Sequence, residues 1–237
     1  MITANVYTRI VFVAFGDSMG TAFTIEVDSR QYLVTARHVA TDRAALTVSE
    51  GDAFVPVSTR DLAVPDNASI DIAVLALGTQ LTRTLPLPAT MDGLIWGQDV
   101  YFLGYPFGMR SLPQPYDRMR PLPFVKHAQF SGEFVDGDGS RVLVLDGLNV
   151  HGMSGGPIVF RPRNSNNFQI AGVVQSFFKR LSPVLNPNHA DVLHPDGAET
   201  GDVVITNSGI VFGYNIDHAV QLARALGTGV QVDTDQS

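Results

Sequence analysis

The sequence of 237 residues contains no cysteine. Disulfides, thiolate metal sites, iron–sulfur clusters and cysteine nucleophiles are therefore excluded. Charged residues are also scarce, at 16% of the chain, where about 25% is usual for a soluble domain. Acidic residues outnumber basic ones by 23 to 16, and the net charge of −7 argues against a nucleic-acid binder. The hydrophobic share of 45% excludes a disordered chain, because such a composition can bury a core.

Long hydrophobic segments are missing as well. The best candidate near the N-terminus is Ile10–Phe15, which is followed by Gly16 and Asp17. A transmembrane helix needs roughly 18 or more apolar residues, and a secretory signal needs a longer apolar core and a small-residue cleavage site. We therefore interpret this run as a buried strand. We expect a cytoplasmic protein without membrane association, and the lack of cysteine is consistent with a reducing compartment.

The apolar runs that are present are short, rich in β-branched residues and bounded by Gly, Pro, Asn or Asp, a pattern typical of strands. They are Arg9–Phe15, Gly20–Val27, Gln31–Thr35, Leu46–Val48, Asp71–Leu77, Asp99–Leu103, Phe124–Phe134, Arg141–Leu145, Pro157–Phe160, Phe168–Ser176 and Gly209–Asn215. The acidic run Asp136–Gly139 is a hairpin-turn signal. It also resembles the start of a calcium loop, but the closing acid is replaced by Gly147.

One helix is predicted near the C-terminus, with Asp217 as its cap, an apolar stripe through Leu226 and Gly227 as its stop. Two proline- or glycine-marked stretches, Tyr105–Pro123 and Asn186–Asn207, are predicted to be loops. Many strands with one terminal helix and no alternation of strand and helix predict an all-β barrel or sandwich.

The strongest chemical signal is Gly152-Met153-Ser154-Gly155-Gly156-Pro157, directly before an apolar strand. A nucleophilic serine needs its hydroxyl presented on a tight turn, with backbone N–H groups directed at the developing oxyanion. Glycines on both sides of Ser154 permit such a turn and let a substrate approach. The alternative is an ordinary glycine-rich loop between two strands.

Two further residues fit the same chemistry. His38 ends an apolar strand and could act as a general base, although a lone histidine at a strand end is often structural. Asp71 opens an apolar strand and could orient an imidazole, although such an aspartate is often a turn residue. The three residues occur in the order His, Asp, Ser with gaps of 33 and 83 residues, and their joint occurrence favours a catalytic triad.

At this point the sequence resembles the chymotrypsin-like, or trypsin-like, serine peptidases, in particular the protease domain of the HtrA/Deg type. The resemblance extends from about residue 9 to residue 226. It rests on these stretches: Gly20–Phe23, Thr35–His38, Asp71–Leu75, Gly104–Gly108, Asp146, Gly152–Pro157 and Ile210–Tyr214. No PDZ-like segment follows residue 226 and no Ile-Val-Gly-Gly-like activation motif is present, so we expect neither HtrA-style activation through such a domain nor trypsin-like zymogen cleavage.

The resemblance implies two six-stranded antiparallel β-barrels, residues 1–88 and 89–237, that together form one protease domain with a short C-terminal helix. It implies a serine endopeptidase in which His38, Asp71 and Ser154 form an acyl-enzyme, with the backbone N–H groups of Gly152 and Ser154 as the oxyanion hole. A protein or peptide is then the substrate.

The resemblance also places a substrate pocket around Leu148 and the strand Gly172–Ser176. Its expected lining residues are Leu148, Val174, Gln175, Ser176 and Phe177. Because Leu148 offers no carboxylate, we expect an uncharged small or medium residue before the scissile bond. We expect no cofactor and no metal site, and we interpret His189, Asp191 and His194 as solvated loop residues.

Two departures from the family pattern concern the serine turn. Met153 replaces the Asp or Asn common before the serine, and His151 stands where another residue is usual. We interpret His151 as a structural or cleft-edge residue. Two alternatives to constitutive hydrolysis stay open: a non-hydrolytic module that binds a partner protein, and a latent protease that an activating partner or ligand switches on.

Overall fold

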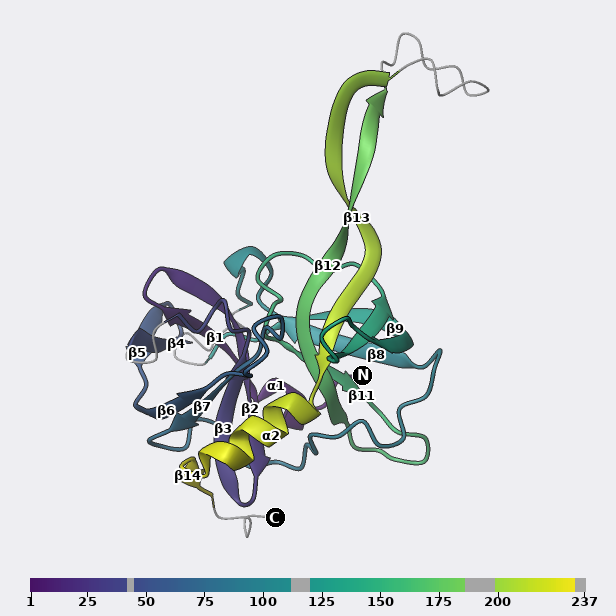
Figure 1. The fold of residues 1–237 in the computed structure, drawn as a ribbon. Coiled ribbons are helices and arrows are strands. Elements are labelled where there is room, and N and C mark those ends of the chain that lie inside the picture. The colour runs from purple at the N-terminus through teal and green to yellow at the C-terminus, as the bar shows by residue number, and fades with distance from the viewer. Residues whose placement is uncertain (42–44, 112–119, 186–198, 233–237) are drawn as a thin grey trace.

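The computed structural model describes residues 1–41, 45–111, 120–185 and 199–232, and for residues 176–185, 199–202 and 205 it describes the backbone only. Two β units lie side by side (Figure 1). His189, Asp191 and His194, which we interpreted as solvated loop residues, lie outside these described residues. Within them, no three His, Asp or Glu side chains are grouped as metal ligands would be, and no helix is long and apolar enough to cross a membrane.

The N-terminal unit is a curled antiparallel sheet whose strands run in the order β5-β4-β1-β2-β3-β7-β6, with β14 added beside β3. Alternating and continuous apolar runs form these strands because one or both of their faces are buried. Their bounds are β1 Ile10–Phe15, β2 Ser18–Val27, β3 Arg30–Thr35, β4 Leu46–Glu50, β5 Ala53–Pro56, β6 Thr59–Ala63, β7 Ala73–Leu77 and β14 Val230–Gln231.

This first unit corrects the prediction of two closed six-stranded barrels. Strands β5 and β6 stand at opposite ends of the strand order, and no ladder joins them in the part of the chain that the structure describes. Every residue of β5 is exposed, and Pro56 at its end has no N–H to donate. The sheet therefore curls as a half-barrel without closing.

The second unit is a closed six-stranded barrel, as predicted, with the order β10-β13-β12-β11-β8-β9. The turn signal at Asp136–Gly139 joins β9 to β10, and the Asp136 carboxylate accepts the N–H groups of Asp138 and Ser140. The strand bounds are β8 Asp99–Gly104, β9 Phe124–Val135, β10 Arg141–Asp146, β11 Pro157–Phe160, β12 Gln169–Leu185 and β13 Glu199–Asn215.

Strands β12 and β13 extend past the barrel as a two-stranded arm (Figure 1). The predicted loop Asn186–Asn207 is therefore wrong for residues 199–207, which belong to β13, while residues 186–198 lie outside the described residues. The β-branched run Val203–Thr206 pairs with β12, and this cross-strand pairing overrides the acidic, glycine-marked composition that suggested a loop.

The helices are short: α1 spans Ala4–Tyr7, the 3-10 helix η2 spans Pro106–Gly108 and α2 spans Asp217–Leu226. Helix α2 ends at Gly227, as predicted, with φ of 60°. Its start differs from the prediction, because Ile216 is the cap residue and Asp217 is the first helical residue. The side chain of Asn215 accepts the Asp217 N–H at 2.8 Å, so asparagine rather than aspartate supplies the capping oxygen.

The buried hydrophobic side chains of the described residues form three clusters, two within single units and one that joins the units. One fills the curled sheet around Val13, Leu33 and Leu75, and another fills the barrel. The largest combines residues of both units, among them Val34 and Val159. The two sheets are therefore packed on each other, and this fixes loops from both units at their shared boundary.

Candidate active site

The first part of the site is a histidine–aspartate pair in the N-terminal unit. His38 lies in the turn after β3, and Asp71 lies two residues before the start of β7, which pairs with β3. His38 Nδ1 lies 2.6 Å from Asp71 Oδ2, and the other carboxylate oxygen accepts the His38 backbone N–H at 2.9 Å. One carboxylate thus fixes both the ring and the main chain of His38. With Nδ1–H donating to Asp71, Nε2 is left with a lone pair that can accept a proton.

The second part is the glycine-rich turn that carries Ser154. Gly152 and Gly155 have φ of 91° and 81°, in the left-handed region that favours glycine. A Cβ on Gly155 would lie 2.6 Å from the Ala36 backbone nitrogen. The turn therefore packs directly against the segment that leads from β3 into His38, and this close approach is possible only without a side chain.

The Ser154 hydroxyl donates a hydrogen bond of 2.8 Å to the carbonyl oxygen of Gln175 in β12. Since a serine hydroxyl has a single proton, that proton is directed at the strand rather than at His38 in this arrangement. Met153, the unusual residue before Ser154, is completely buried in the barrel core. Its side chain anchors the turn to the barrel core.

Thr21 in β2 holds the serine turn to the N-terminal unit. Its buried hydroxyl donates to the carbonyl of Gly152 at 2.7 Å and accepts the N–H of Tyr105 at 3.0 Å. The carbonyl of His151 accepts the Phe107 N–H at 2.8 Å. Because the carbonyl and N–H of a trans peptide point in opposite directions, this bond turns the Gly152 N–H away from Phe107.

These contacts leave two backbone donors beside the serine. Among the residues that the structure describes, neither the Gly152 N–H nor the Ser154 N–H donates to a protein acceptor. Two unpaired N–H groups on one tight turn are what an oxyanion hole requires.

The predicted pocket residues differ in how far their side chains are buried. Leu148 is 59% exposed in the segment after β10, and its carbonyl accepts the Lys126 ammonium at 2.7 Å. Gln175 is half-buried, and its carbonyl faces Ser154. Val174 is fully buried in the barrel core, so its side chain does not line a pocket, which corrects that prediction. The side chains of Ser176 and Phe177 lie outside the described residues.

Residues 20–163 match the family described as the trypsin-like peptidase domain. The chain belongs to this family. It is a serine endopeptidase, a hydrolase. No curated protein matches the sequence, so the more detailed comparison comes from solved structures.

The solved structures similar to this trypsin-like peptidase include two forms of one protease and a second, HtrA-type protease. The inactive form of the Rv3671c protease has 20% identity and a TM-score of 0.58, covering 94% of this chain and 91% of that one. The active form, from M. tuberculosis, also has 20% identity, with a TM-score of 0.56 and coverage of 98% and 86%. The HtrA-type protease AlgW with a tripeptide has 16% identity and a TM-score of 0.61, and the match covers 94% of this chain and 61% of AlgW. These likenesses establish the fold.

Tyr214 is a residue of this peptidase site for which sequence reasoning assigned no function. It lies in β13, accepts the Gln175 side-chain N–H at 2.9 Å and donates to the Ser69 carbonyl, two residues before Asp71. Ser69 is also held from its other side, since its hydroxyl donates to Asp138 at 2.7 Å. Burial is the main cause that raises the pKa of Tyr214 above its usual value, so the phenol stays neutral and able to donate. Tyr214 thus connects β12, through Gln175, to the segment that leads into Asp71, and so links the two units.

Replacing Tyr214 with phenylalanine is expected to lower kcat about tenfold, because the Asp71 loop loses its hydrogen bond to the barrel. The measurement is steady-state hydrolysis of a peptide ester, together with the pH profile. A positioning effect lowers kcat and shifts the acid limb, since the His38–Asp71 geometry loosens. Loss of thermal stability with an unchanged kcat and pH profile would instead mean that Tyr214 is only structural. Tyr101→Phe, in β8, is the matched control and is expected to leave both unchanged.

The pH dependence of activity follows from the hydrogen-bonded pair of His38 and Asp71. The hydrogen bond to Asp71 is the main cause that raises the pKa of His38 above 6.5; burial of the ring opposes it, and the Asp71 charge adds to it. Only neutral His38 can accept a proton, so kcat/KM is expected to fall as the pH drops through a midpoint above 6.5. NMR titration of the His38 ring in Ser154→Ala protein checks the assignment. A midpoint at or below 6.5 in both measurements would contradict it.

Proposed function

We propose that this peptidase hydrolyses peptide bonds through His38, Asp71 and Ser154 by way of an acyl-enzyme. The observation that carries the proposal is the double hydrogen bond from His38 to the Asp71 carboxylate, beside a glycine turn that presents a serine and two unpaired N–H groups. An exposed His–Asp pair also occurs at His127 and Asp99, but of these two pairs the one at His38 adjoins such a turn.

The chemistry proceeds in two steps. Ser154 Oγ attacks the substrate carbonyl while His38 Nε2 takes its proton, and the resulting oxyanion is stabilised by the N–H groups of Gly152 and Ser154. The imidazolium then donates its proton to the leaving amine as the C–N bond breaks. Water attacks the acyl-enzyme with His38 as base again, which releases the carboxylic acid and restores the Ser154 hydroxyl.

Because the Ser154 hydroxyl bonds to the Gln175 carbonyl, substrate binding also has to release this hydroxyl before it can react. A polypeptide that pairs with the edge of β12 as an added strand brings backbone N–H groups to its carbonyls. A substrate N–H that bonds to the Gln175 carbonyl competes with the Ser154 hydroxyl for that acceptor. The displaced hydroxyl is then free to rotate toward His38, so productive alignment is coupled to substrate binding.

This same bond favours the alternative of a latent protease. In the arrangement described, the serine proton points at Gln175, which is not the direction needed for transfer to His38. An activating partner or ligand that reorients the turn would have the same effect as a bound substrate. The latent form differs from the constitutive one in requiring that addition before any peptide is cleaved.

The residue before the scissile bond is proposed to be uncharged and small or medium in size. Leu148 offers no carboxylate, and Lys126 places a positive charge against its carbonyl, so a substrate Lys or Arg would be left without a counter-charge. The test is digestion of an unfolded protein by the wild type, with mass spectrometry of the new termini and Ser154→Ala as background. We expect Ala, Val, Leu or Thr before most cleaved bonds. Cleavage after Lys and Arg in preference to these residues would overturn the proposed specificity while leaving the triad intact.

A further inference from the structure

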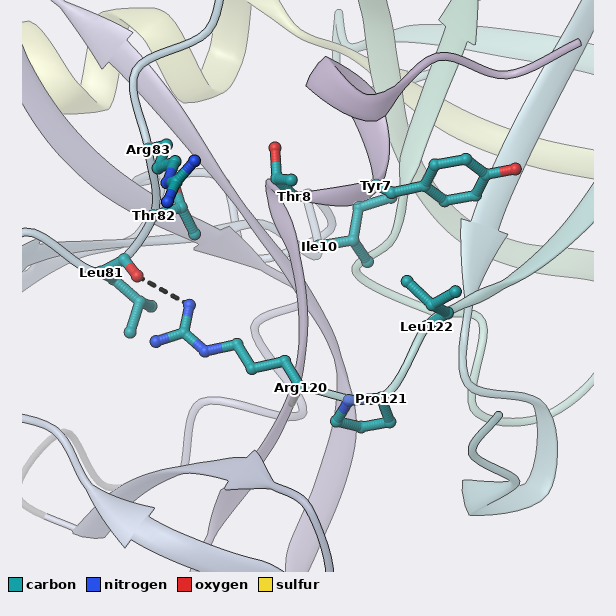
Figure 2. Close-up of a pocket in the computed structure, with 9 residues that line it drawn as sticks. All are labelled: Tyr7, Thr8, Ile10, Leu81, Thr82, Arg83, Arg120, Pro121 and Leu122. Atoms are coloured by element: carbon teal, nitrogen blue, oxygen red, sulfur yellow. Dashed lines mark hydrogen bonds between the residues drawn. The ribbon is translucent and has the colours of Figure 1, made fainter. Parts of the chain in front are cut away.

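A cavity of about 420 Å³ lies between the N-terminal segment, the connection that follows β7 and the segment that leads into β9. Figure 2 shows its walls. The residues around it come from three separate stretches of chain: Tyr7, Thr8, Ile10, Leu81, Thr82, Arg83, Arg120, Pro121 and Leu122. The volume falls in the range of about 300–1,000 Å³ that small-molecule sites have.

One end of this cavity is cationic. Arg83 and Arg120 both line it, and no carboxylate belongs to the lining. Arg120 is held in place by its hydrogen bond to the Leu81 carbonyl at 2.7 Å and by Glu50 at 3.4 Å, which leaves further N–H groups of its guanidinium to donate. Arg83 is exposed, and among the described residues its side chain makes no hydrogen bond or ion pair. Glu50 pairs with Arg120 from outside the lining, whereas the Arg83 guanidinium has no described carboxylate partner, so in a chain with a net charge of −7 this end of the cavity is complementary to an anion.

The other end is apolar. Ile10 and Leu122 lie across from the two guanidinium groups (Figure 2). Ile10 is buried, whereas Leu122 is 39% exposed, so Leu122 offers apolar surface that a ligand can cover. The cavity therefore pairs a cationic end with an apolar end.

The wall of the cavity is fixed in advance by Tyr105. Its hydroxyl donates to the Pro121 carbonyl at 2.8 Å and lies 3.4 Å from the Ile10 carbonyl, so it joins two stretches of the lining. Burial raises the pKa of Tyr105, which keeps the phenol protonated as a donor. A wall held by a buried hydrogen bond requires little ordering when a ligand binds.

We propose that this cavity binds a small carboxylate with an apolar tail. The carboxylate accepts hydrogen bonds from Arg83 and Arg120, as guanidinium groups favour, and the tail packs on Ile10 and Leu122. The site is separate from His38 and Ser154, and its occupancy does not depend on the proposed peptidase mechanism.

The test is calorimetric titration of the full chain with octanoate, and with acetate, octanol and octylammonium as comparison probes. Octanoate is expected to bind at least tenfold more tightly than any of the three, because it alone satisfies both ends of the cavity. Its affinity is expected to fall as salt is added, since the head group is recognised by charge.

Two variants locate the binding. Arg83→Gln is expected to weaken octanoate binding about tenfold, whereas Arg163→Gln, an equal loss of charge at an exposed turn residue that does not line the cavity, is expected to leave the affinity unchanged. Methyl signals of Ile10 and Leu122 are expected to shift on titration. The proposal is overturned by an absence of octanoate binding, by equal affinities of the two variants, or by octanol binding as tightly as octanoate.

Discussion

Replacing Ser154 with alanine is expected to lower kcat/KM for a peptide ester by about 10⁴-fold or more, because no other group can form the acyl-enzyme. The hydroxyl makes one hydrogen bond, to the Gln175 carbonyl, so its removal is expected to change the stability little. The measurement combines steady-state hydrolysis with urea unfolding. Any residual rate above the uncatalysed one reflects the oxyanion-hole donors and substrate binding.

The control for this variant is Ser165→Ala. The Ser165 hydroxyl lies in an exposed turn and bonds only to the backbone of Asn167, so the activity and the unfolding midpoint of this variant are expected to match the wild type. If Ser154→Ala kept more than about a tenth of the wild-type rate while folding normally, Ser154 could not be the nucleophile.

Replacing Asp71 with asparagine is expected to lower kcat by about 10⁴-fold. In the wild type, the Asp71 carboxylate accepts hydrogen bonds from two N–H groups, that of the His38 main chain and that of Nδ1 in its ring. An asparagine oxygen can keep only one of these positions, and the amide NH₂ at the other would donate to Nδ1. The ring would then carry its proton on Nε2, where it cannot accept one from Ser154.

The chain offers a close control for this variant. Asp99 pairs with Nε2 of His127 at 2.8 Å, with both side chains more than half exposed. Asp99→Asn removes the same charge from a similar pair, and we expect full activity. NMR of the imidazole nitrogens then reports the tautomer directly: His38 is expected to change from Nδ1–H to Nε2–H in Asp71→Asn. A loss of rate without that change would assign Asp71 a purely electrostatic contribution.

The site could be predicted from sequence where backbone geometry restricts the residue type. The turn around Ser154 needs positive φ at Gly152 and Gly155 and has no room for a Cβ, so its glycines form a pattern that is visible without a structure. His38 and Asp71 lie next to strands with clear apolar runs, and β3 and β7 pair to bring the two residues together. Local pattern and tertiary position agree in these segments.

Other features depend on contacts between segments that are distant in sequence. Tyr214 reads as a strand residue, and only the packing of the barrel against the Asp71 loop brings its hydroxyl to Ser69. Strand β5 is exposed along its whole length, so it carries no apolar alternation from which a strand could be inferred. The open edge of the N-terminal sheet and the long β12–β13 arm were missed for similar reasons, because pairing rather than composition determines both.

The most direct test of the proposed mechanism is labelling with a fluorophosphonate probe, which reacts only with a serine that a neighbouring base activates. Wild type, Ser154→Ala and His38→Ala are compared, each after a folding check, and the wild type is also labelled with an unfolded protein substrate present. We expect the wild type to be labelled at Ser154 and neither variant to be labelled. Labelling at another residue, or equal labelling of His38→Ala, would contradict a nucleophile activated by His38.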